Sequence, residues 1–542
     1  MPVISDASFS KAVHVIAVHG DTDIFPYPFD DFVMYDVPDK VVAALKETEV
    51  SLSHASGGAK YDQYFEQHPV NHYSTLSPVS QTGFRWATQL DPFWNAYLLA
   101  AVIEIAPDIE AARLPRDQKQ VFAYRYNNES TNQLYLESAW RQFQEETRKR
   151  SESDSCKYVV TADISDFYPR IYHHRLENSL KTAAPEKPDV IRTIMSILFR
   201  IAQNQSYGLP VGSDASRLLA ECALDKVDHL LATNDDTQQF CRYVDDYRFF
   251  VESEEQAYRA IAYLSEKLQL NEGLSLQKSK TRIMSVKEYQ TMLEPPRPVS
   301  GSAADFMSMH IHYDPYSSTA DADYEEIKKK LSDFNIADLL NKELDKSQIH
   351  VSLTKKLIGI LKLLDSEEQA RIIETLLDNI DQLIPVVPQV MKAVKQATSN
   401  MDKDVSASVQ SRIRNLIIEN RPIAQIDLNR AYMIRVLGTQ HSQENEQLLI
   451  KLYSEDSPVI IKRDIMLIMA NWGASYWVSD RKNYLGQEDK WVQRAFFLAS
   501  YALGDEGRHW RQHKETSGYD KVISEWAALK RSKLGAKWVI PL

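Results

Sequence analysis

Hydrophobic and polar positions follow two different periods along this chain of 542 residues. Between residues 157 and 290, runs rich in β-branched and aromatic residues alternate with helical repeats of apolar positions. The runs at 157–163 and 239–252 predict strands, whereas 189–203, 213–233 and 254–270 predict helices. We therefore expect an α+β domain whose sheet is backed by helices.

The pattern before this domain is less regular. Residues 1–80 are rich in aromatic residues, Asp and Pro, and Pro26 and Pro28 are expected to exclude a regular helix. We predict an extended arm packed through its aromatic side chains. Residues 81–150 are predicted to be mostly helical. Their expected elements are a helix over 95–110 whose apolar stripe ends near Pro107, a strand over 120–126 and a helix over 134–150.

The second half of the chain carries a helical pattern almost throughout. Residues 292–322 concentrate Pro, Ser and Ala and predict a linker. Residues 323–542 read as amphipathic helices recurring roughly every 35–45 residues, a spacing typical of stacked helical pairs. The expected domains are therefore 1–80, 81–291 and 323–542, with 292–322 as the linker.

Composition narrows the class of protein. Three widely spaced cysteines and no Cys-x-x-Cys pair argue against a zinc site or a disulfide framework and favour a reducing cytoplasm. No signal peptide and no membrane-spanning segment are predicted, so we expect no membrane partner. The net charge of −12 argues against a protein that grips long duplexes, which usually carries a basic excess.

Three aspartates are placed where they could meet. Asp163 ends the first predicted strand, and Asp245 and Asp246 interrupt the second one. Adjacent carboxylates in an apolar run are costly to bury without a compensating cation. Clustered carboxylates bind Mg²⁺, with Mn²⁺ as a substitute, and Mg²⁺ serves phosphate chemistry. Either motif alone also fits a plain strand end or hairpin tip, but together they indicate a nucleotidyltransferase.

Several neighbouring residues suit the same chemistry. Tyr168 is expected to close over the sugar of an incoming nucleotide. Lys280 is expected near the leaving pyrophosphate, as a general acid or as electrostatic relief. Arg125 is expected to hold triphosphate oxygens with its forked donors. The turn at 208–213 feeds a helix, and its glycines allow the backbone to approach a ligand. Each of these residues also has a plain interpretation as a core or surface residue.

Taken in order, these motifs resemble those of reverse transcriptases. Residues 163–168, 208–213, 243–246 and 273–281 look like the first to fourth palm motifs of that family. The second motif reads Pro210-Val211-Gly212, where most reverse transcriptases have Pro-Gln-Gly. Its continuation over 215–221 is similar to the abortive-infection and related defence-associated reverse transcriptases of bacteria.

The resemblance implies a fold and a set of site residues. The fold would be reverse-transcriptase-like fingers and palm, with 1–80 contributing to the fingers, followed by an all-α domain of HEAT-like helical repeats. The implied metal ligands are Asp163, Asp245, Asp246 and Ile164, with Lys280 as a further catalytic residue. The implied nucleotide-binding residues are Tyr168, Phe167, Arg125, Gly212 and Pro210.

The resemblance also implies a function in bacterial anti-phage defence. It implies protein-primed, template-independent synthesis of single-stranded DNA from dNTPs in the bacterial cytoplasm. The product would stay attached to a tyrosine, with Tyr27 and Tyr35 as candidates, and the protein would form a trimer or hexamer. One alternative is RNA-templated synthesis from a dedicated non-coding RNA. Another, of a different class, is a nucleotide-binding scaffold or sensor that acts as a toxic effector without polymerising.

Overall fold

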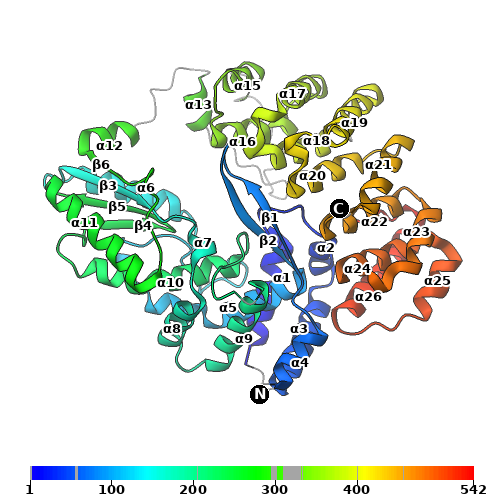
Figure 1. Cartoon of the computed structure of the whole chain (residues 1–542), viewed down its shortest axis with the longest axis horizontal. Helices are drawn as coiled ribbons and strands as arrows, with labels where there is room; N and C mark the ends of the chain where they lie inside the picture. The colour runs from blue at the N-terminus through cyan, green and yellow to red at the C-terminus, as the bar shows by residue number, and fades with distance from the viewer. Residues whose placement is uncertain are drawn as a thin grey trace. The chain divides into compact units, whose positions relative to one another are not determined.

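The computed structural model describes residues 3–54, 59–203, 205–293, 302–308, 331, 334–398, 401–455 and 457–542. The chain divides into two compact units (Figure 1). The first unit comprises Met1–Ser74, Ala87–Leu293 and Lys514–Pro541, and the second comprises Thr75–Trp86, Glu294–His513 and Leu542. The last helical segment thus packs with the first unit, whereas the sequence pattern assigned it to the C-terminal domain. Most of the expected linker at 292–322 lies outside the described residues.

A four-stranded antiparallel sheet lies in the first unit, with strand order β4-β5-β3-β6. Its strands are β3 (Tyr158–Asp163), β4 (Phe240–Tyr243), β5 (Asp246–Val251) and β6 (Arg282–Ser285). The predicted strand at 157–163 is thus present, and the single predicted run at 239–252 is a hairpin of two strands. In its register Asp163 pairs with Asp246 and Tyr158 with Val251.

Helices cover both faces of this sheet. On one face Val159, Cys241 and Phe250 pack with Phe143 and Tyr289 in one apolar cluster. The last two residues belong to α6 (Ala139–Ser151) and α12 (Val286–Leu293). On the other face α11 (Glu254–Lys267) packs against β3 and β5. Because both faces are buried, the strands read as continuous apolar runs and not as an alternation.

The other helices of the first unit are mostly N-terminal. The predicted arm over 1–80 is wrong, because the described residues of this region form four helices and a strand over 72–78, and the loop around Pro26 and Pro28 is one of the short irregular segments between them. Pro28 caps one helix, and Pro38 begins the next, a position where a missing N–H costs nothing. The helices are α1 (Asp6–His19), α2 (Phe29–Asp36), α3 (Pro38–His54), α4 (Ala59–Gln67), α5 (Pro92–Ala112), α7 (Phe167–Arg170), α8 (His173–Ala183), α9 (Pro188–Ile201), α10 (Asp214–Ala232) and α26 (Gly518–Leu534).

Two local expectations between residues 92 and 151 have different outcomes. The helix expected over 95–110 is confirmed as α5, which continues through Pro107, and Lys187 Nζ donates to the Glu104 carbonyl in the preceding turn at 2.6 Å. The strand expected over 120–126 is wrong: the region forms two isolated bridges, of Val121 with Arg242 and of Tyr126 with Tyr135, since Tyr124 between them takes a φ of 47° that no strand allows.

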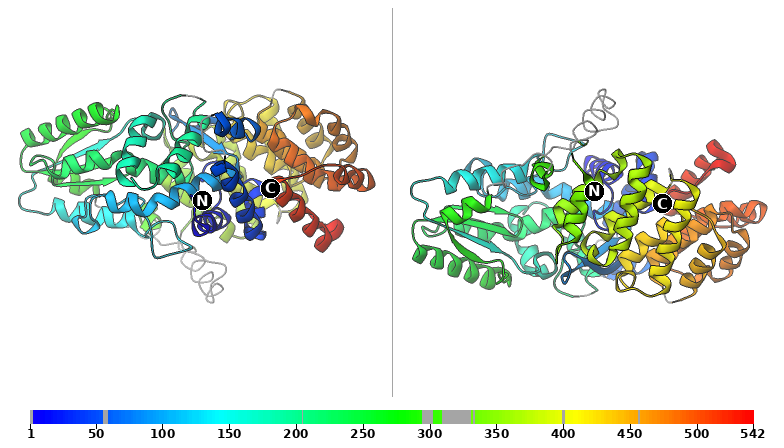
Figure 2. Two further views of the ribbon diagram at one scale, coloured as in Figure 1. Left: turned by 90° about the horizontal axis from the view of Figure 1, so that it is seen from below. Right: turned by 90° about the horizontal axis from the view of Figure 1, so that it is seen from above.

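A two-stranded sheet and a series of helices complete the chain. Strands β1 (His72–Pro78) and β2 (Phe84–Leu90) form a hairpin. In the second unit α16, α18, α20, α22 and α24 each pack on the next, and α15, α17, α19, α21 and α23 pack against that row. Figures 1 and 2 show these helices following one another in sequence order, coloured from yellow-green to orange. Their bounds are α13 (Ala303–Ser308), α15 (Ile336–Leu344), α16 (Val351–Gly359), α17 (Ser366–Asp378), α18 (Val387–Thr398), α19 (Lys403–Ile418), α20 (Asp427–Leu437), α21 (Gln443–Ser454), α22 (Val459–Asn471), α23 (Ser475–Arg481), α24 (Lys490–Ala499) and α25 (Gly504–Gln512).

None of the helices in the described segments combines the length and the apolarity that crossing a membrane requires.

Candidate nucleotidyl-transfer site

The sheet brings the three predicted aspartates together. Asp163 is the last residue of β3 and lies opposite Asp246, the first residue of β5. Asp245 occupies the turn between β4 and β5, and its carbonyl accepts a 3.0 Å hydrogen bond from the Ile164 backbone N–H. The hairpin tip and the carboxylate cluster are therefore the same feature, not alternatives.

Two basic residues compensate the outer carboxylates. Lys280 Nζ donates to Asp163 Oδ2 at 2.9 Å. Arg248, two residues beyond Asp246 on the same strand face, binds both oxygens of that carboxylate, with Nη2 2.9 Å from Oδ2. Lys280 thus lies at the site, as the sequence predicted, whereas Arg248 was missed.

Asp245 sits in a less favourable electrostatic position. Burial, together with the neighbouring Asp163 and Asp246, raises the pKa of its carboxyl to about 6, against the opposing effects of a backbone hydrogen bond and of Lys280. Three carboxylates converge here with two basic partners. The residue with the raised pKa is the one without a direct ion pair among the described residues.

The donor set fits a hard divalent cation. Carboxylate oxygens are the ligands that Mg²⁺ and Mn²⁺ prefer, and a cation would relieve the repulsion at Asp245. As the side chains stand, no three His, Cys, Asp or Glu residues of the described chain are grouped closely enough to hold a metal. The ion pairs explain this, since Asp163 and Asp246 are each turned toward a basic side chain. Metal binding would need both carboxylates to exchange these partners.

The turn that carries Asp245 has a strained backbone and is held in place by a buried arginine. Val244 has a φ of 55°, a conformation that a β-branched residue rarely adopts. The fully buried Arg242 donates to the Val244 carbonyl at 2.8 Å. Its guanidinium also pairs with Glu221 at 3.0 Å and with Asp228 at 2.5 Å. Arg242 therefore ties the turn to α10.

The same buried network reaches a second strained residue. Arg113 pairs with Glu221 at 2.5 Å and donates to the carbonyls of Ala123 and Tyr124. Glu221 thus joins the Asp245 turn to the loop at Tyr124. Sequence reasoning missed this network, because charged residues in a helix and a strand are usually read as exposed.

Tyr168 lies within electrostatic range of Asp245. Burial raises the pKa of Tyr168 well above its usual value, and Tyr124, Glu221 and Asp245 contribute to that rise. Its carbonyl accepts from the Leu209 N–H at 2.9 Å, which joins the first motif to the turn at 208–213. The structure therefore brings Tyr168 and the second motif to the site.

Phe167 and Ile164 are placed differently. Their side chains are core residues, 3% and 2% exposed respectively. A nucleotide contact by the Phe167 ring is therefore excluded in this conformation. Ile164 can serve a ligand only through its backbone.

The second motif is packed against the N-terminal loop between α1 and α2. Gly212 has a φ of 115°, and a Cβ there would lie 2.7 Å from Thr22 Oγ1 and 3.2 Å from Ile24 Cδ1. The carbonyl of the preceding residue, Val211, accepts a 3.4 Å hydrogen bond from the Thr88 N–H. Gly212 therefore allows close backbone approach, but what approaches it here is the chain itself.

Arg217 stabilises the loop between α1 and α2, a role that sequence reasoning missed. Its guanidinium donates to Asp214 at 2.7 Å and to Asp23 at 3.0 Å. It also lies over the ring of Tyr124, 5.5 Å from the centroid. The spacing of Asp214 and Arg217 by three residues on a helix was the available signal.

Arg125, in contrast, is not at the site. Its side chain is buried and donates to the carbonyls of Leu114 and Val121 and to Glu110. Burial, together with the nearby Arg113, lowers the pKa of Arg125 to about 10. With its donors engaged in the core, Arg125 cannot hold a triphosphate in this structure, so that prediction is corrected.

Of the two tyrosines predicted as primers, Tyr27 lies just before α2 and Tyr35 lies near its end. Tyr27 is 41% exposed in the loop before this helix, with its ring against Gly20. Burial, together with Asp31, Asp21 and Asp23, raises the pKa of Tyr27. Tyr35 lies within α2 and is 68% exposed.

A known protein family matches the part of the chain that contains this site. Residues 106–313 match the family model described as "Reverse transcriptase (RNA-dependent DNA polymerase)". That range includes β3, the β4–β5 hairpin and Lys280. The chain therefore contains a reverse transcriptase domain, which implies nucleotidyltransferase activity of the DNA polymerase type, and such domains generally use divalent metal ions.

Similar solved structures were also found, whereas no curated protein matches the chain. One is telomerase from Candida albicans in complex with the TWJ fragment of telomeric RNA. It has 11% identity and a TM-score of 0.30, and covers 65% of this chain and 69% of that one. Apo telomerase from Candida tropicalis has 13% identity, a TM-score of 0.31 and coverages of 69% and 71%. Telomerase from Candida tropicalis with the TWJ fragment has 12% identity, a TM-score of 0.32 and coverages of 74% and 70%.

Proposed function

We propose that this protein is a Mg²⁺-dependent DNA polymerase of the reverse transcriptase type. The observation that carries the proposal is the convergence of Asp163, Asp245 and Asp246 at the ends of adjacent antiparallel strands, with Lys280 beside them. An inert scaffold gains nothing from three mutually repelling carboxylates at one point. A non-catalytic nucleotide sensor is therefore disfavoured.

Each residue takes a definite role in nucleotide addition. Asp163 and Asp245 would hold the divalent ions, assisted by Asp246 and the backbone of Ile164. Bound metal supplies activation of the attacking oxygen and charge stabilisation at the phosphate. Lys280 would donate a proton to the leaving pyrophosphate or neutralise its charge once released from Asp163. Tyr168, with Pro210 and Gly212, would line the nucleotide pocket and select the sugar.

We further propose that synthesis is template-independent and primed by the protein. Val211 replaces the glutamine that the resemblance associates with the templating pair, and Thr22 and Ile24 fill the space beside Gly212. Tyr27 is the favoured primer over Tyr35, because it belongs to the same loop as Thr22. The product would be single-stranded DNA covalently attached to this tyrosine.

RNA-templated synthesis is the second candidate. It is favoured by one observation, the match of residues 106–313 to a family described as RNA-dependent DNA polymerases. The template would be a dedicated non-coding RNA, and a discrete RNA species would then purify with the protein.

The biological setting follows from the motif resemblance alone. We propose a role in anti-phage defence through abortive infection in the bacterial cytoplasm. The stacked helices of the second unit would form HEAT-like repeats that support a trimer or hexamer. Analytical ultracentrifugation tests the assembly, and phage plaque assays with Asp245→Asn test the role.

The deciding experiment is incorporation of labelled dNTPs by nuclease-treated protein with Mg²⁺ and no added nucleic acid. Label that stays on the protein band in a denaturing gel, and is absent in Asp245→Asn, is the expected result. Tyr27→Phe should remove the label and Tyr35→Phe should retain it. Activity that appears only after a co-expressed RNA is restored would favour the second candidate, and full activity of Asp245→Asn would end the assignment.

A further inference from the structure

A pocket of about 650 Å³ lies in the first unit, mainly between α8 and α9, which pack on each other (Figure 1). Its described lining residues do not include the three aspartates. The volume is within the range of sites that enclose one small molecule. Part of the lining is apolar or aromatic, and these residues are Tyr172, Pro188, Ile191, Met195 and Phe199.

The charged side chains of this pocket compensate one another. Each of its three basic lining residues forms an ion pair with an acidic neighbour, at 2.7 to 2.9 Å. The pairs are Lys181 with Glu177, Arg192 with Asp189 and Arg200 with Asp62. Among the described lining residues no Lys or Arg is therefore left to attract an anion, so the pocket favours an uncharged group.

His173 supplies a second, independent indication of a ligand. The residue is 6% exposed and lines the pocket, and its Nε2 lies 2.8 Å from the Gly208 carbonyl oxygen. Because a carbonyl only accepts, Nε2 carries the proton of the neutral ring. Burial lowers the pKa of His173, which favours this neutral form and leaves Nδ1 as an acceptor. Nδ1 is buried and has no hydrogen-bond partner among the described residues, and a ligand N–H group would satisfy it.

Two aromatic side chains of the pocket are widely exposed. Tyr172 immediately precedes α8 and is 41% exposed, and Phe199 lies in the last turn of α9 and is 44% exposed. Exposed aromatic rings offer flat surfaces on which a heterocycle can stack. An uncharged, flat group with an N–H donor therefore fits the rings, the compensated charges and His173 Nδ1 together.

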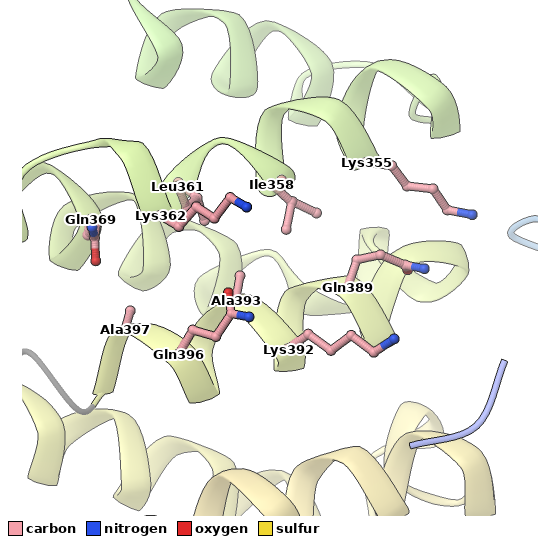
Figure 3. Close-up of a pocket in the computed structure, with 11 residues that line it drawn as sticks. Lys355, Ile358, Leu361, Lys362, Gln369, Gln389, Lys392, Ala393, Gln396 and Ala397 are labelled. Carbon is pink, nitrogen blue, oxygen red and sulfur yellow. The ribbon is translucent and has the colours of Figure 1, made fainter. Parts of the chain in front are cut away.

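A second cavity, in the helical unit, lies between α16 and α18 and has a different lining (Figure 3). Its three lysines, Lys355, Lys362 and Lys392, each already have a partner within the chain. Its described lining residues include no aromatic ring. That cavity therefore offers a ligand neither a free cation nor a stacking surface.

We propose that the pocket between α8 and α9 binds a nucleobase, with its ring against Tyr172 and Phe199 and an N–H group donating to His173 Nδ1. All common nucleobases are flat, uncharged and carry an N–H donor. A free nucleoside and a base within a strand present the same chemistry. The site goes beyond the proposed polymerase activity and does not depend on it, because neither the aspartates nor a metal ion takes part.

The test is the fluorescence of 2-aminopurine riboside titrated with the full chain in EDTA. This base carries an amino donor, and its emission changes when it is stacked. Wild type should bind it, and Tyr172→Ser/Phe199→Ser should bind it at least about tenfold more weakly. The matched control, Phe32→Ser/Tyr258→Ser, changes two aromatic residues of the same unit that are 40% and 63% exposed, and should bind as wild type.

Circular dichroism and thermal melting establish that both double variants are folded. No binding by wild type, or equal affinity in the pocket variant and the control, would overturn the proposal.

The variant His173→Gln tests the hydrogen bond separately from the rings. Its amide N–H can replace Nε2 at the Gly208 carbonyl, but it places no acceptor at the position of Nδ1. We expect an unchanged Tm and binding of 2-aminopurine riboside about fivefold weaker. Unchanged affinity would overturn the role of Nδ1, on which the proposal rests.

Two further measurements identify the source of the base and separate this pocket from the aspartates. An oligo(dT) strand with one central 2-aminopurine should give the same dependence on Tyr172 and Phe199 if the pocket takes a base from a strand. A response of the riboside alone would instead identify a free nucleoside as the ligand. Asp245→Asn should bind either probe as wild type does, whatever its polymerase activity. Loss of binding in Asp245→Asn would place the ligand at the aspartates and overturn the proposal.

Discussion

Asp245 holds its proton more tightly than an ordinary aspartate, because it is buried and faces two other carboxylates. A group whose pKa is raised to about 6 in the folded state stabilises the fold most when it is protonated. The stabilisation is full below the unfolded pKa of about 3.9 and is lost as the pH rises through about 6. At neutral pH the ionised Asp245 carboxylate therefore lowers the free energy of unfolding.

Asp245→Asn should consequently stabilise the metal-free protein while removing activity. Discounted for partial exposure to solvent, the gain at pH 7.5 should be on the order of 1–2 kcal/mol, visible as a higher Tm in EDTA. Incorporation of dNTPs should fall by at least about a thousandfold. Asp246→Asn is the control, because it breaks the ion pair with Arg248 and should give no such gain. A lower Tm for Asp245→Asn would show that its charge is compensated.

Metal binding should depend on pH through the same carboxyl. Mg²⁺ competes with the proton at Asp245, so the rise in Tm that Mg²⁺ causes should shrink as the pH falls through about 6. Thermal melts with and without Mg²⁺ between pH 5.5 and 8 provide the measurement. Asp245→Asn should show no Mg²⁺-dependent rise at any pH. A constant rise in wild type across this range would mean that Asp245 stays ionised.

Arg125 illustrates what a sequence cannot distinguish at the residue scale. Its position in an aromatic run gave no sign that its donors are used by Glu110 and two backbone carbonyls. The aspartates were predictable, because a buried acidic pair is too costly to occur without a function. Arg248 was not, since an arginine near an acid in sequence is usually a surface pair, and for Arg217 the only signal was its spacing of three residues from Asp214 on a helix.

Arg125→Met should therefore act on stability and not on substrate binding. It leaves Glu110 with fewer partners in a buried network, at a cost of about 2–4 kcal/mol. We expect a lower Tm in thermal melts and an unchanged KM for dNTPs in the material that remains folded. A raised KM with an unchanged Tm would restore the triphosphate role.

The β4–β5 hairpin is the element that places two of the three aspartates at the candidate nucleotidyl-transfer site. Its strands were predictable as a β-branched and aromatic run, but the strained Val244 between them was not, because no glycine marks the turn. The buried Arg242 explains why the turn tolerates this residue, since it binds the Val244 carbonyl and two acids of α10. The turn geometry is thus set by a helix that lies elsewhere in the sequence.

Replacing Arg242 should lower catalysis only by changing the position of the turn that carries Asp245. Arg242→Lys keeps the charge but loses the fork, so we expect kcat to fall about tenfold, the half-saturating Mg²⁺ concentration to rise and KM for dNTPs to stay unchanged. Steady-state kinetics over a Mg²⁺ series gives these values. Arg242→Met, which strands two buried carboxylates, should lose about 3–5 kcal/mol of stability. Wild-type Mg²⁺ dependence in Arg242→Lys would show that the turn does not need the fork.

At the scale of the whole molecule, the chain leaves the first unit after Leu293 and returns to it at Lys514. The helical unit is therefore largely an insertion, although the linear pattern of helices after residue 322 predicted an appended domain. Such a return has no local signal, because α26 is amphipathic like the helices before it. What identifies it is its contacts with α2 and α3.

Substitution of Trp526 on α26 tests whether the last helix packs with the first unit. Its side chain is 1% exposed, and its Nε1 donates to Asp36 at 2.7 Å, beside the ion pairs of Lys530 with Asp36 and Lys40 with Glu525. Trp526→Ala should cost about 3–5 kcal/mol. Hydrogen exchange should then increase in α2 and α3, because their packing partner is loosened.

Trp477→Ala, a buried tryptophan of the helical unit, serves as the matched control and should increase exchange around α21–α23 instead. Exchange that rises near α22 in Trp526→Ala, with α3 unchanged, would assign the last helix to the second unit. If α3 responds as expected, a fragment that ends in the region of residues 292–322 lacks a structural part of the polymerase unit. Activity measured on such a fragment would then report on a damaged fold and not on the isolated enzyme.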